Sequence, residues 1–69
     1  MITEIKNNLK KIRKSNNLTQ KELADKLGMK KGSVIYMENK TSKISRVVLD
    51  KLIEIFNCKD TDIIEYNFE

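Results

Sequence analysis

The 69-residue sequence contains no histidine, no tryptophan and no proline, and its only cysteine is Cys58. A single thiol cannot form an internal disulfide, and one cysteine without histidine does not supply the ligands of an ordinary zinc site. Without histidine there is no Ser–His or Cys–His pair, and no glycine-rich phosphate loop is present. We therefore expect no enzyme activity, no metal and no cofactor, and interpret Cys58 as a small buried residue.

Long apolar runs are missing as well. No stretch approaches the roughly 20 residues that a membrane-spanning helix needs, and the first fourteen residues alternate charged with apolar side chains, unlike a signal peptide. The cytoplasm is the expected location. With no proline and only two glycines there is no linker, so residues 1–69 are expected to form one small domain. Nothing in the sequence indicates a small-molecule ligand.

Positive charge is in excess, and it is concentrated at one end. Residues 1–46 hold twelve Lys or Arg against four Asp or Glu, whereas residues 47–69 hold two against six. Such an uneven distribution of charge along the chain is typical of proteins that bind polyanions, although a solvated lysine-rich surface would have the same composition. RNA is disfavoured as the polyanion, because aromatic residues make up only 6% of the chain and provide no stacking platform.

The apolar residues recur with helical spacing over most of the chain. A helix over 20–27 is predicted because Thr19 can cap it and Glu22 can reach back to the N–H of Thr19, forming a capping box. Gly28 can adopt the left-handed turn that often ends a helix. Further helices are expected over about 31–39, from Ser45 to Phe56 and from about Asp60 to Ile64, after a first helix that ends near Ser15.

Ala24, Gly28 and Val34 have the spacing of a helix-turn-helix, with a small residue where two helices cross, a glycine in the turn and an apolar residue between the helices. The motif reads LTQKELADKLGMKKGSVIYMEN, and ISRVVLDKLIEIFNCKDTDIIEY follows it. From about Leu9 to Ile64 the chain resembles the lambda-repressor/Cro family of regulators, also called the xenobiotic-response-element family. The resemblance implies an all-α, compact five-helix domain with its helix-turn-helix at about 19–39. Such a domain binds operator DNA, usually as a dimer on a palindrome.

The resemblance also implies roles for residues of the motif. Gln20 is expected to contact a phosphate and to brace the recognition helix. Base edges are expected to be read by residues near the start and on one face of that helix, namely Lys30, Lys31, Gly32 and Tyr36. Contacts to the DNA backbone are expected from Ser33, Asn39, Lys40 and Lys43. Ile35 should point outward, where it would either touch a thymine methyl group or be an incidental surface residue.

Two residues depart from the family's pattern. Gly32 stands where many relatives carry a reading side chain, so it either lets the backbone approach DNA closely or reads nothing. Lys40 replaces a usual glycine, which leaves Asn39 to adopt the left-handed conformation. Relatives often bury an ion pair between the positions of Arg13 and Glu38. We expect a structural pair here, with direct DNA contact by Arg13 as the alternative.

The C-terminal tail is more apolar than a solvated end requires, since it carries Ile63, Tyr66 and Phe68. Polar and apolar residues alternate along it as in a strand, so the tail can fold back on Met1–Ile5. The two ends would then form a short two-stranded β-sheet, and the first helix would begin near Asn8. The same tail residues can also form a dimer interface, and the two arrangements can coexist.

The residues and the resemblance together predict a sequence-specific double-stranded DNA-binding transcriptional regulator of bacterial or phage type, which we expect to be a repressor. It would read a palindromic operator through helix 31–39 as a homodimer. The alternative function is that of a protein-interaction module of antitoxin or anti-repressor type, which would use the apolar C-terminal tail.

Overall fold

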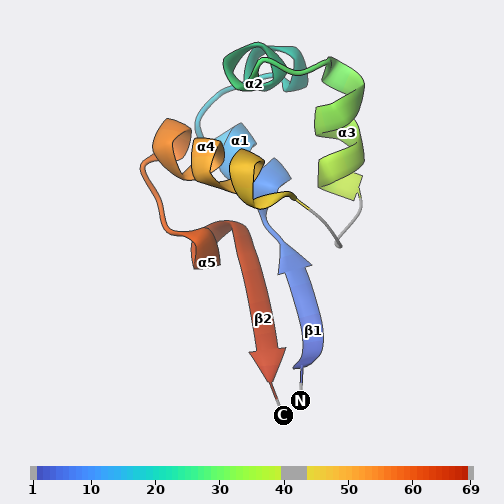
Figure 1. Cartoon of the computed structure of the whole chain (residues 1–69), viewed down its shortest axis with the longest axis vertical. Helices are drawn as coiled ribbons and strands as arrows, with labels where there is room; N and C mark the ends of the chain where they lie inside the picture. The colour runs from blue at the N-terminus through green and yellow to red at the C-terminus, as the bar shows by residue number, and fades with distance from the viewer. Residues whose placement is uncertain (1, 40–43, 69) are drawn as a thin grey trace.

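The computed structural model describes residues 2–39 and 44–68, and Figure 1 shows helices grouped above a two-stranded ribbon. In chain order the elements are β1 (Ile2–Asn7), α1 (Leu9–Ser15), α2 (Gln20–Leu27), α3 (Lys31–Asn39), α4 (Arg46–Phe56), α5 (Asp60–Ile63) and β2 (Ile64–Phe68). The predicted five-helix fold and the small sheet between the two ends are therefore confirmed. Lys40 and Lys43, which were expected to contact DNA, lie outside the described residues.

The helix-turn-helix begins with the predicted capping box. Thr19 Oγ1 accepts a 3.1 Å hydrogen bond from the Glu22 N–H, and Glu22 Oε1 accepts a 2.9 Å bond from the Thr19 N–H. These bonds satisfy two N–H groups that the start of a helix leaves without partners. At the other end of α2, Gly28 has φ 68°, the left-handed conformation that glycine adopts without a Cβ penalty. The predicted bounds of α2 and α3 are confirmed. The left-handed conformation expected of Asn39 is wrong, because this residue continues α3 and, among the described non-glycine residues, positive φ angles occur at Asn17 and Asn57.

The C-terminal helices also begin and end at local signals. Ser45 Oγ accepts a 3.4 Å hydrogen bond from the Val48 N–H, which caps α4. The helix ends at Asn57, whose φ of 50° places this asparagine in the left-handed region. The single turn of α5 follows, and β2 begins directly after it.

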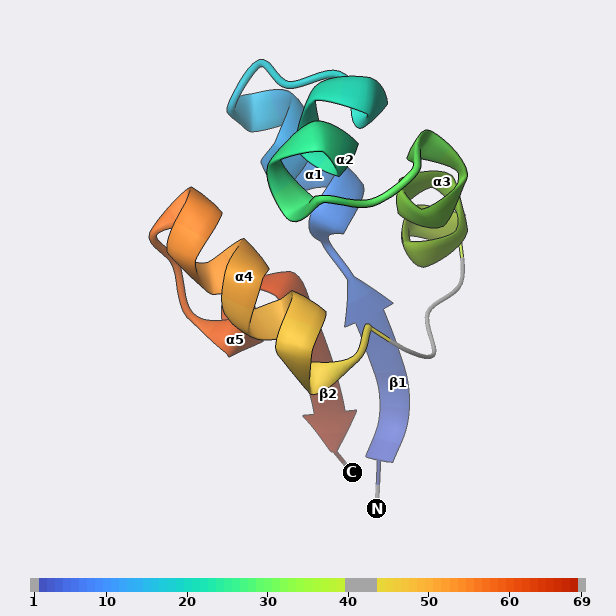
Figure 2. The same cartoon turned by 45° about the horizontal axis from the view of Figure 1, so that its top comes forward.

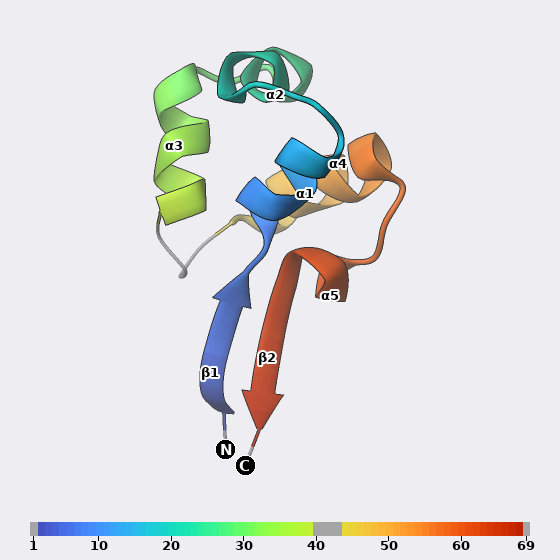
Figure 3. The same ribbon diagram turned by 180° about the vertical axis from the view of Figure 1, so that it is seen from behind.

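The ribbon formed by β1 and β2 projects from the helices, with both chain ends at its far end (Figures 1 and 3). The molecule is consequently elongated, 37 Å long and 22 by 21 Å across. The strands pair antiparallel from Asn7 opposite Ile64 to Ile2 opposite Phe68, with a register shift between Ile2 and Glu4. α1 begins after Asn8, as expected for a chain whose ends pair.

The core lies between the helices and above the ribbon. Its buried apolar side chains come from α1 to α5: Leu9, Leu23, Ala24, Leu27, Val34, Met37, Leu52 and Ile63. Ile63 is 0% exposed, so the expectation that it forms part of a dimer surface is wrong for this fold. The short α5 turns this side chain under α4, and the exposed apolar residues of the tail are Tyr66 and Phe68. Within the described residues, no helix is long and apolar enough to cross a membrane.

Candidate nucleic-acid interface

α3 packs on α2 through its apolar side and leaves its other side exposed. Val34 is 0% exposed, and it packs with Ala24 of α2 in the core. The small Ala24 side chain lets the two helices approach closely, as the motif requires. Figure 2 shows α3 at the margin of the helical group, joined to α2 by the turn that contains Gly28. The recognition helix is therefore held from one side and open on the other.

The exposed surface of α3 contains most of the residues that were expected to read bases. Lys30, Lys31 and Gly32 are exposed at its start, and Tyr36 follows one turn later with 60% of its surface exposed. Asn39 is also exposed, whereas Ser33 is half-buried. Ile35 is half-buried as well, so it lies at the edge of this surface rather than pointing freely outward. α3 therefore presents one exposed, partly basic side, and a helix exposed in this way is the kind of element that the major groove of DNA admits.

A buried ion pair ties the end of α3 to α1. Arg13 Nε lies 2.6 Å from Glu38 Oε2, and the two side chains are only 8% and 2% exposed. A second guanidinium nitrogen, Nη1, donates to the main-chain oxygen of Leu18 at 2.7 Å. The guanidinium of Arg13 is thus buried and engaged within the protein, which supports the structural role over direct DNA contact.

Gln20 joins the same network from the first turn of α2. Its Nε2 donates a 3.1 Å hydrogen bond to Glu38 Oε1, so Glu38 links α1, α2 and α3. An amide nitrogen carries two hydrogens, so the same group can brace Glu38 and donate to a DNA phosphate. This geometry is compatible with both roles expected for Gln20.

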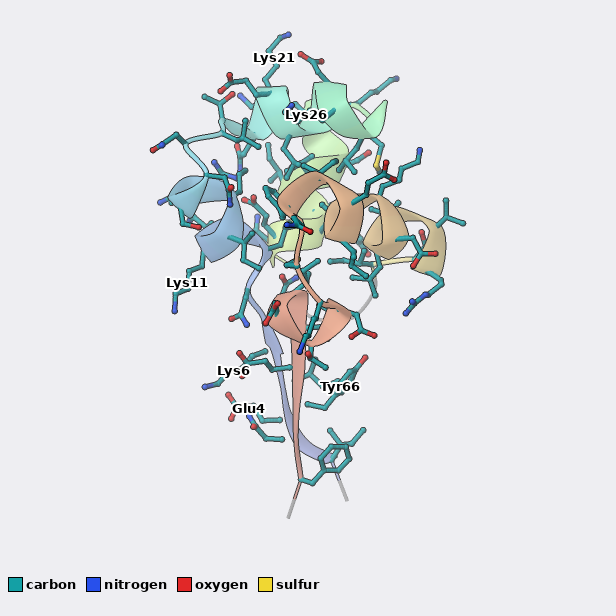
Figure 4. All side chains as sticks on the ribbon, turned by 90° about the vertical axis from the view of Figure 1, so that its left-hand side faces the viewer. Glu4, Lys6, Lys11, Lys21, Lys26 and Tyr66 are labelled. Atoms are coloured by element: carbon teal, nitrogen blue, oxygen red, sulfur yellow. The ribbon has the colours of Figure 1, made fainter. Side chains whose placement is uncertain are left out.

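Exposed lysines also occur on α1 and α2. Figure 4 shows Lys21 and Lys26 at the end of the molecule that is remote from the ribbon, and Lys11 further down towards it. Lys21 forms an exposed ion pair with Asp25 at 3.3 Å, which contributes little to stability but lowers the local positive charge. In the described part of the chain, no cluster of His, Cys, Asp and Glu could hold a metal ion.

The start of α4 borders the exposed side of α3, which the sequence did not indicate. A shallow groove of about 360 Å³ runs between α3 and the start of α4, and it is lined by Gly32, Ser33 and Tyr36 on one side and by Ser45 and Val48 on the other. Ser45 was recognisable as a helix cap, but its position beside α3 depends on how α4 packs in the core. No local sequence signal could have placed it there.

Cys58, between α4 and α5, is half-buried and packs against the core. Burial raises the pKa of the thiol, and the negative charge of Asp62 raises it further. The thiol is therefore protonated at neutral pH and a poor nucleophile, which agrees with its interpretation as a packing residue.

Comparison with known proteins places this geometry in a family. A family model described as helix-turn-helix matches residues 9–63. Antitoxin PezA from Streptococcus pneumoniae serotype 4 is 37% identical over 57 residues, which cover 83% of this chain and 36% of that protein. The aligned part therefore amounts to about a third of the length of this curated relative. Members of the matched family are DNA-binding regulators and generally not enzymes. The chain, with its capped α2, its Gly28 turn and its exposed α3, belongs to the Cro-type helix-turn-helix family of DNA-binding proteins.

Proposed function

We propose that this protein is a sequence-specific transcriptional repressor that acts in the cytoplasm and binds a palindromic DNA operator as a homodimer. The observation that carries the proposal is the exposed surface of α3, which begins with Lys30 and Lys31 and is held from behind by the buried Arg13–Glu38 pair. Lysines supply phosphate contacts and hydrogen-bond donors for guanine, so one helix can provide both affinity and discrimination.

Gly32 and Tyr36 define the middle of the proposed reading surface. Because Gly32 has no side chain and its missing Cβ would meet no atom within 4 Å, the backbone of α3 can come closest to DNA at this point. Tyr36, exposed on the same side, then reaches either a base edge or the sugar-phosphate backbone. Gln20, Ser33, Asn39, Lys40 and Lys43 are proposed to contact the DNA backbone.

A homodimer is proposed because one recognition helix reads only about one half-site. A second copy doubles the phosphate contacts and places two recognition helices roughly 34 Å apart on one side of the duplex. A bound repressor of this kind would act by occupying its operator.

The proposal is tested by selecting binding sites from a random duplex library with the intact protein. The expected result is an enriched palindrome that the protein shifts in a salt-dependent manner on a gel. Lys31→Glu should abolish the shift, whereas Lys59→Glu, an equal charge change at the start of α5, should reduce it only slightly. Enrichment of no duplex, or equal losses for the two variants, would refute the proposal.

The second candidate is an antitoxin-type protein-interaction module. It is favoured by the similarity to Antitoxin PezA and by the exposed apolar residues Tyr66 and Phe68. A module of this type would bind a partner protein through the tail and would show no sequence preference among duplexes. The site selection described above therefore separates the two functions, and a protein with both properties would still enrich a palindrome.

A further inference from the structure

One face of the ribbon formed by β1 and β2 is apolar, and the register shift between Ile2 and Glu4 adds one apolar side chain to it. Tyr66 pairs with Ile5 and Phe68 pairs with Ile2, so these four side chains lie on the same face. Strict alternation would place Ile2 with Glu4 and Lys6 on the other face, but the register shift between Ile2 and Glu4 returns Ile2 to the apolar side. Figure 4 shows Tyr66 on the opposite side of the ribbon from Glu4 and Lys6. We call Ile2, Ile5, Tyr66 and Phe68 the apolar ribbon face.

The side chains of the apolar ribbon face are all more than a third exposed. Its exposed fractions are 49% for Ile2, 38% for Ile5, 51% for Tyr66 and 70% for Phe68. With aromatic side chains of 150–250 Å², the face exposes on the order of 400 Å² of apolar surface. The largest apolar patch on a monomeric protein is typically about 300–600 Å², and such a patch is often an interaction site. An isolated two-stranded ribbon is also only marginally stable in water, so it benefits from a cover.

A hollow lies beside this face, between α4, α5 and β2. It has a volume of about 120 Å³, and its apolar lining comes from Leu49, Ile64 and Tyr66. A cavity of about 150 Å³ accommodates benzene, so the hollow is close to the size of a phenyl ring. Thr61 and the Arg46–Asp60 ion pair complete its lining.

A two-fold interface needs a self-complementary surface, and a projecting side chain beside a hollow can provide one. In such an interface the same patch is used by both copies, so each projection must find its hollow on an identical surface. Phe68 is the most exposed side chain of the apolar ribbon face, and the hollow begins at Tyr66, two residues away. The face carries no charge, so two copies of it do not repel each other. It also offers nothing to a phosphate backbone.

We propose that the apolar ribbon face is the dimer surface of this protein, with Phe68 of each copy seated in the hollow of the other. The proposal rests on the homodimeric form of the proposed function and specifies its interface. A standard interface buries about 800 Å² on each partner, so the ribbon alone supplies about half of this area. The first turns of α4, which carry Arg46 and Leu49 at the hollow, supply further contact area. The dimer therefore depends on both ends of the chain, because β1 contributes Ile2 and Ile5.

The test is sedimentation equilibrium of the full chain without DNA, from low to high micromolar concentration. The parent protein is expected to reach twice the monomer mass. Phe68→Ser should raise the dimer dissociation constant roughly tenfold or more, as expected for a central interface residue. Lys6→Ser, on the opposite face of the same ribbon, is the matched control and should leave the constant nearly unchanged.

A second variant addresses the hollow without altering the ribbon. Thr61 is exposed and lines the hollow, so Thr61→Tyr should fill it while the core stays intact. The expected result is the same loss of dimer as in Phe68→Ser, with an unchanged circular dichroism spectrum. If Phe68→Ser fails to fold, Thr61→Tyr decides the question alone.

The outcomes separate this proposal from the proposed function. A parent that stays monomeric, or a dimer that tolerates both Phe68→Ser and Thr61→Tyr, overturns the interface, even if the protein selects an operator. A dimer that both variants dissociate supports the interface, even if no duplex is enriched. A parent that is monomeric but captures a different purified protein through Phe68 would overturn the self-association and favour the antitoxin-type function.

Discussion

The side-chain amide of Asn7, at the end of β1, donates a 2.6 Å hydrogen bond to the main-chain oxygen of Met37 in the last turn of α3. The same side chain accepts a 2.9 Å bond from the Leu9 N–H at the start of α1. Both backbone groups belong to helix ends, where no partner exists within the helix. Asn7 therefore connects the ribbon, α1 and the recognition helix.

Replacing Asn7 with alanine should lower the free energy of unfolding by about 1–3 kcal/mol, because two partly buried backbone groups lose their partner. Urea denaturation measures the change. Asn16→Ala is the control, since the Asn16 side chain is exposed and donates to the Ile12 main-chain oxygen within its own helix end. Equal, small effects of the two substitutions would show that the Asn7 bonds contribute little.

Glu38→Ala should destabilise the fold by roughly 3–5 kcal/mol, because it leaves the buried Arg13 guanidinium without its counter-charge. Arg13→Ala should have a similar effect, and the double substitution should cost clearly less than the sum of the two. Thermal melting of the four proteins completes this cycle. A Glu38→Ala protein that melts like the parent but binds DNA poorly would contradict the structural role.

Lys31→Ala should cost roughly 1–3 kcal/mol on the selected operator and much less on random duplex, because Lys31 is proposed to read a base. For Lys40 and Lys43 the expectation is different. Because these two lysines are proposed to contact phosphates, replacing either with alanine should weaken binding to both duplexes alike. It should also reduce the slope of log affinity against log salt concentration by about one unit. Fluorescence anisotropy titrations at several salt concentrations measure both quantities. If Lys31→Ala loses the same affinity for both duplexes, Lys31 contacts a phosphate and does not read a base.

The two glycines should respond to alanine with opposite signs. A Cβ would meet no atom within 4 Å at either position, so only backbone conformation matters for stability. Gly28 has φ 68°, and Gly28→Ala should cost about 1–2 kcal/mol. Gly32 lies within α3, and Gly32→Ala should stabilise the fold by about 0.5–1 kcal/mol.

Operator binding of Gly32→Ala then distinguishes the two interpretations of this position. Weaker binding by a more stable protein would indicate that the backbone approaches DNA closely at Gly32. Unchanged binding would mean that this position reads nothing.

Glu22 should contribute a pH-dependent part of the stability of α2. The hydrogen bond from the Thr19 N–H lowers the pKa of this carboxyl below its ordinary value of 4.5, and the Thr19 hydroxyl adds to the effect. Because the pKa is lower in the folded than in the unfolded state, the contribution is present above the unfolded pKa. It is lost as pH falls through the folded pKa.

Glu22→Gln is the matching variant, since glutamine keeps the capping bond but does not titrate. The stability difference between parent and variant should therefore shrink as the pH falls below the ordinary carboxyl pKa of 4.5, when measured by urea denaturation across a pH series. A difference that is independent of pH would contradict the assignment.

Local signals made much of the helical fold predictable. The capping box of Thr19 and Glu22 marks the start of α2, and Gly28 marks its end. Each of these signals lies within four residues of the helix end that it determines. Ser45 similarly marks the start of α4. Such interactions are complete within one turn of the chain, so the sequence alone reveals them.

Features that depend on packing between distant segments were not predictable in the same way. Asn8 was expected to cap α1, and it occupies the N-cap position, but its side chain makes no capping bond and donates instead to Asp62 and Glu65. The Leu9 N–H at the start of the helix donates to Asn7. Ile63 was expected on a surface and lies in the core, since α5 folds under α4. For the DNA surface, the sequence motif identified α3, but not the groove that α4 forms beside it.

The pairing of β1 with β2 also has a consequence for the order of folding. It joins residues 2–7 to residues 64–68, so nearly the whole chain forms the loop that the ribbon closes. Closing a flexible loop of this length costs about 3–4 kcal/mol of chain entropy, whereas each helix forms from contacts within a few residues. The helices should therefore assemble first and shorten the effective loop. The ribbon amides should be the last to gain protection from hydrogen exchange and the first to lose it.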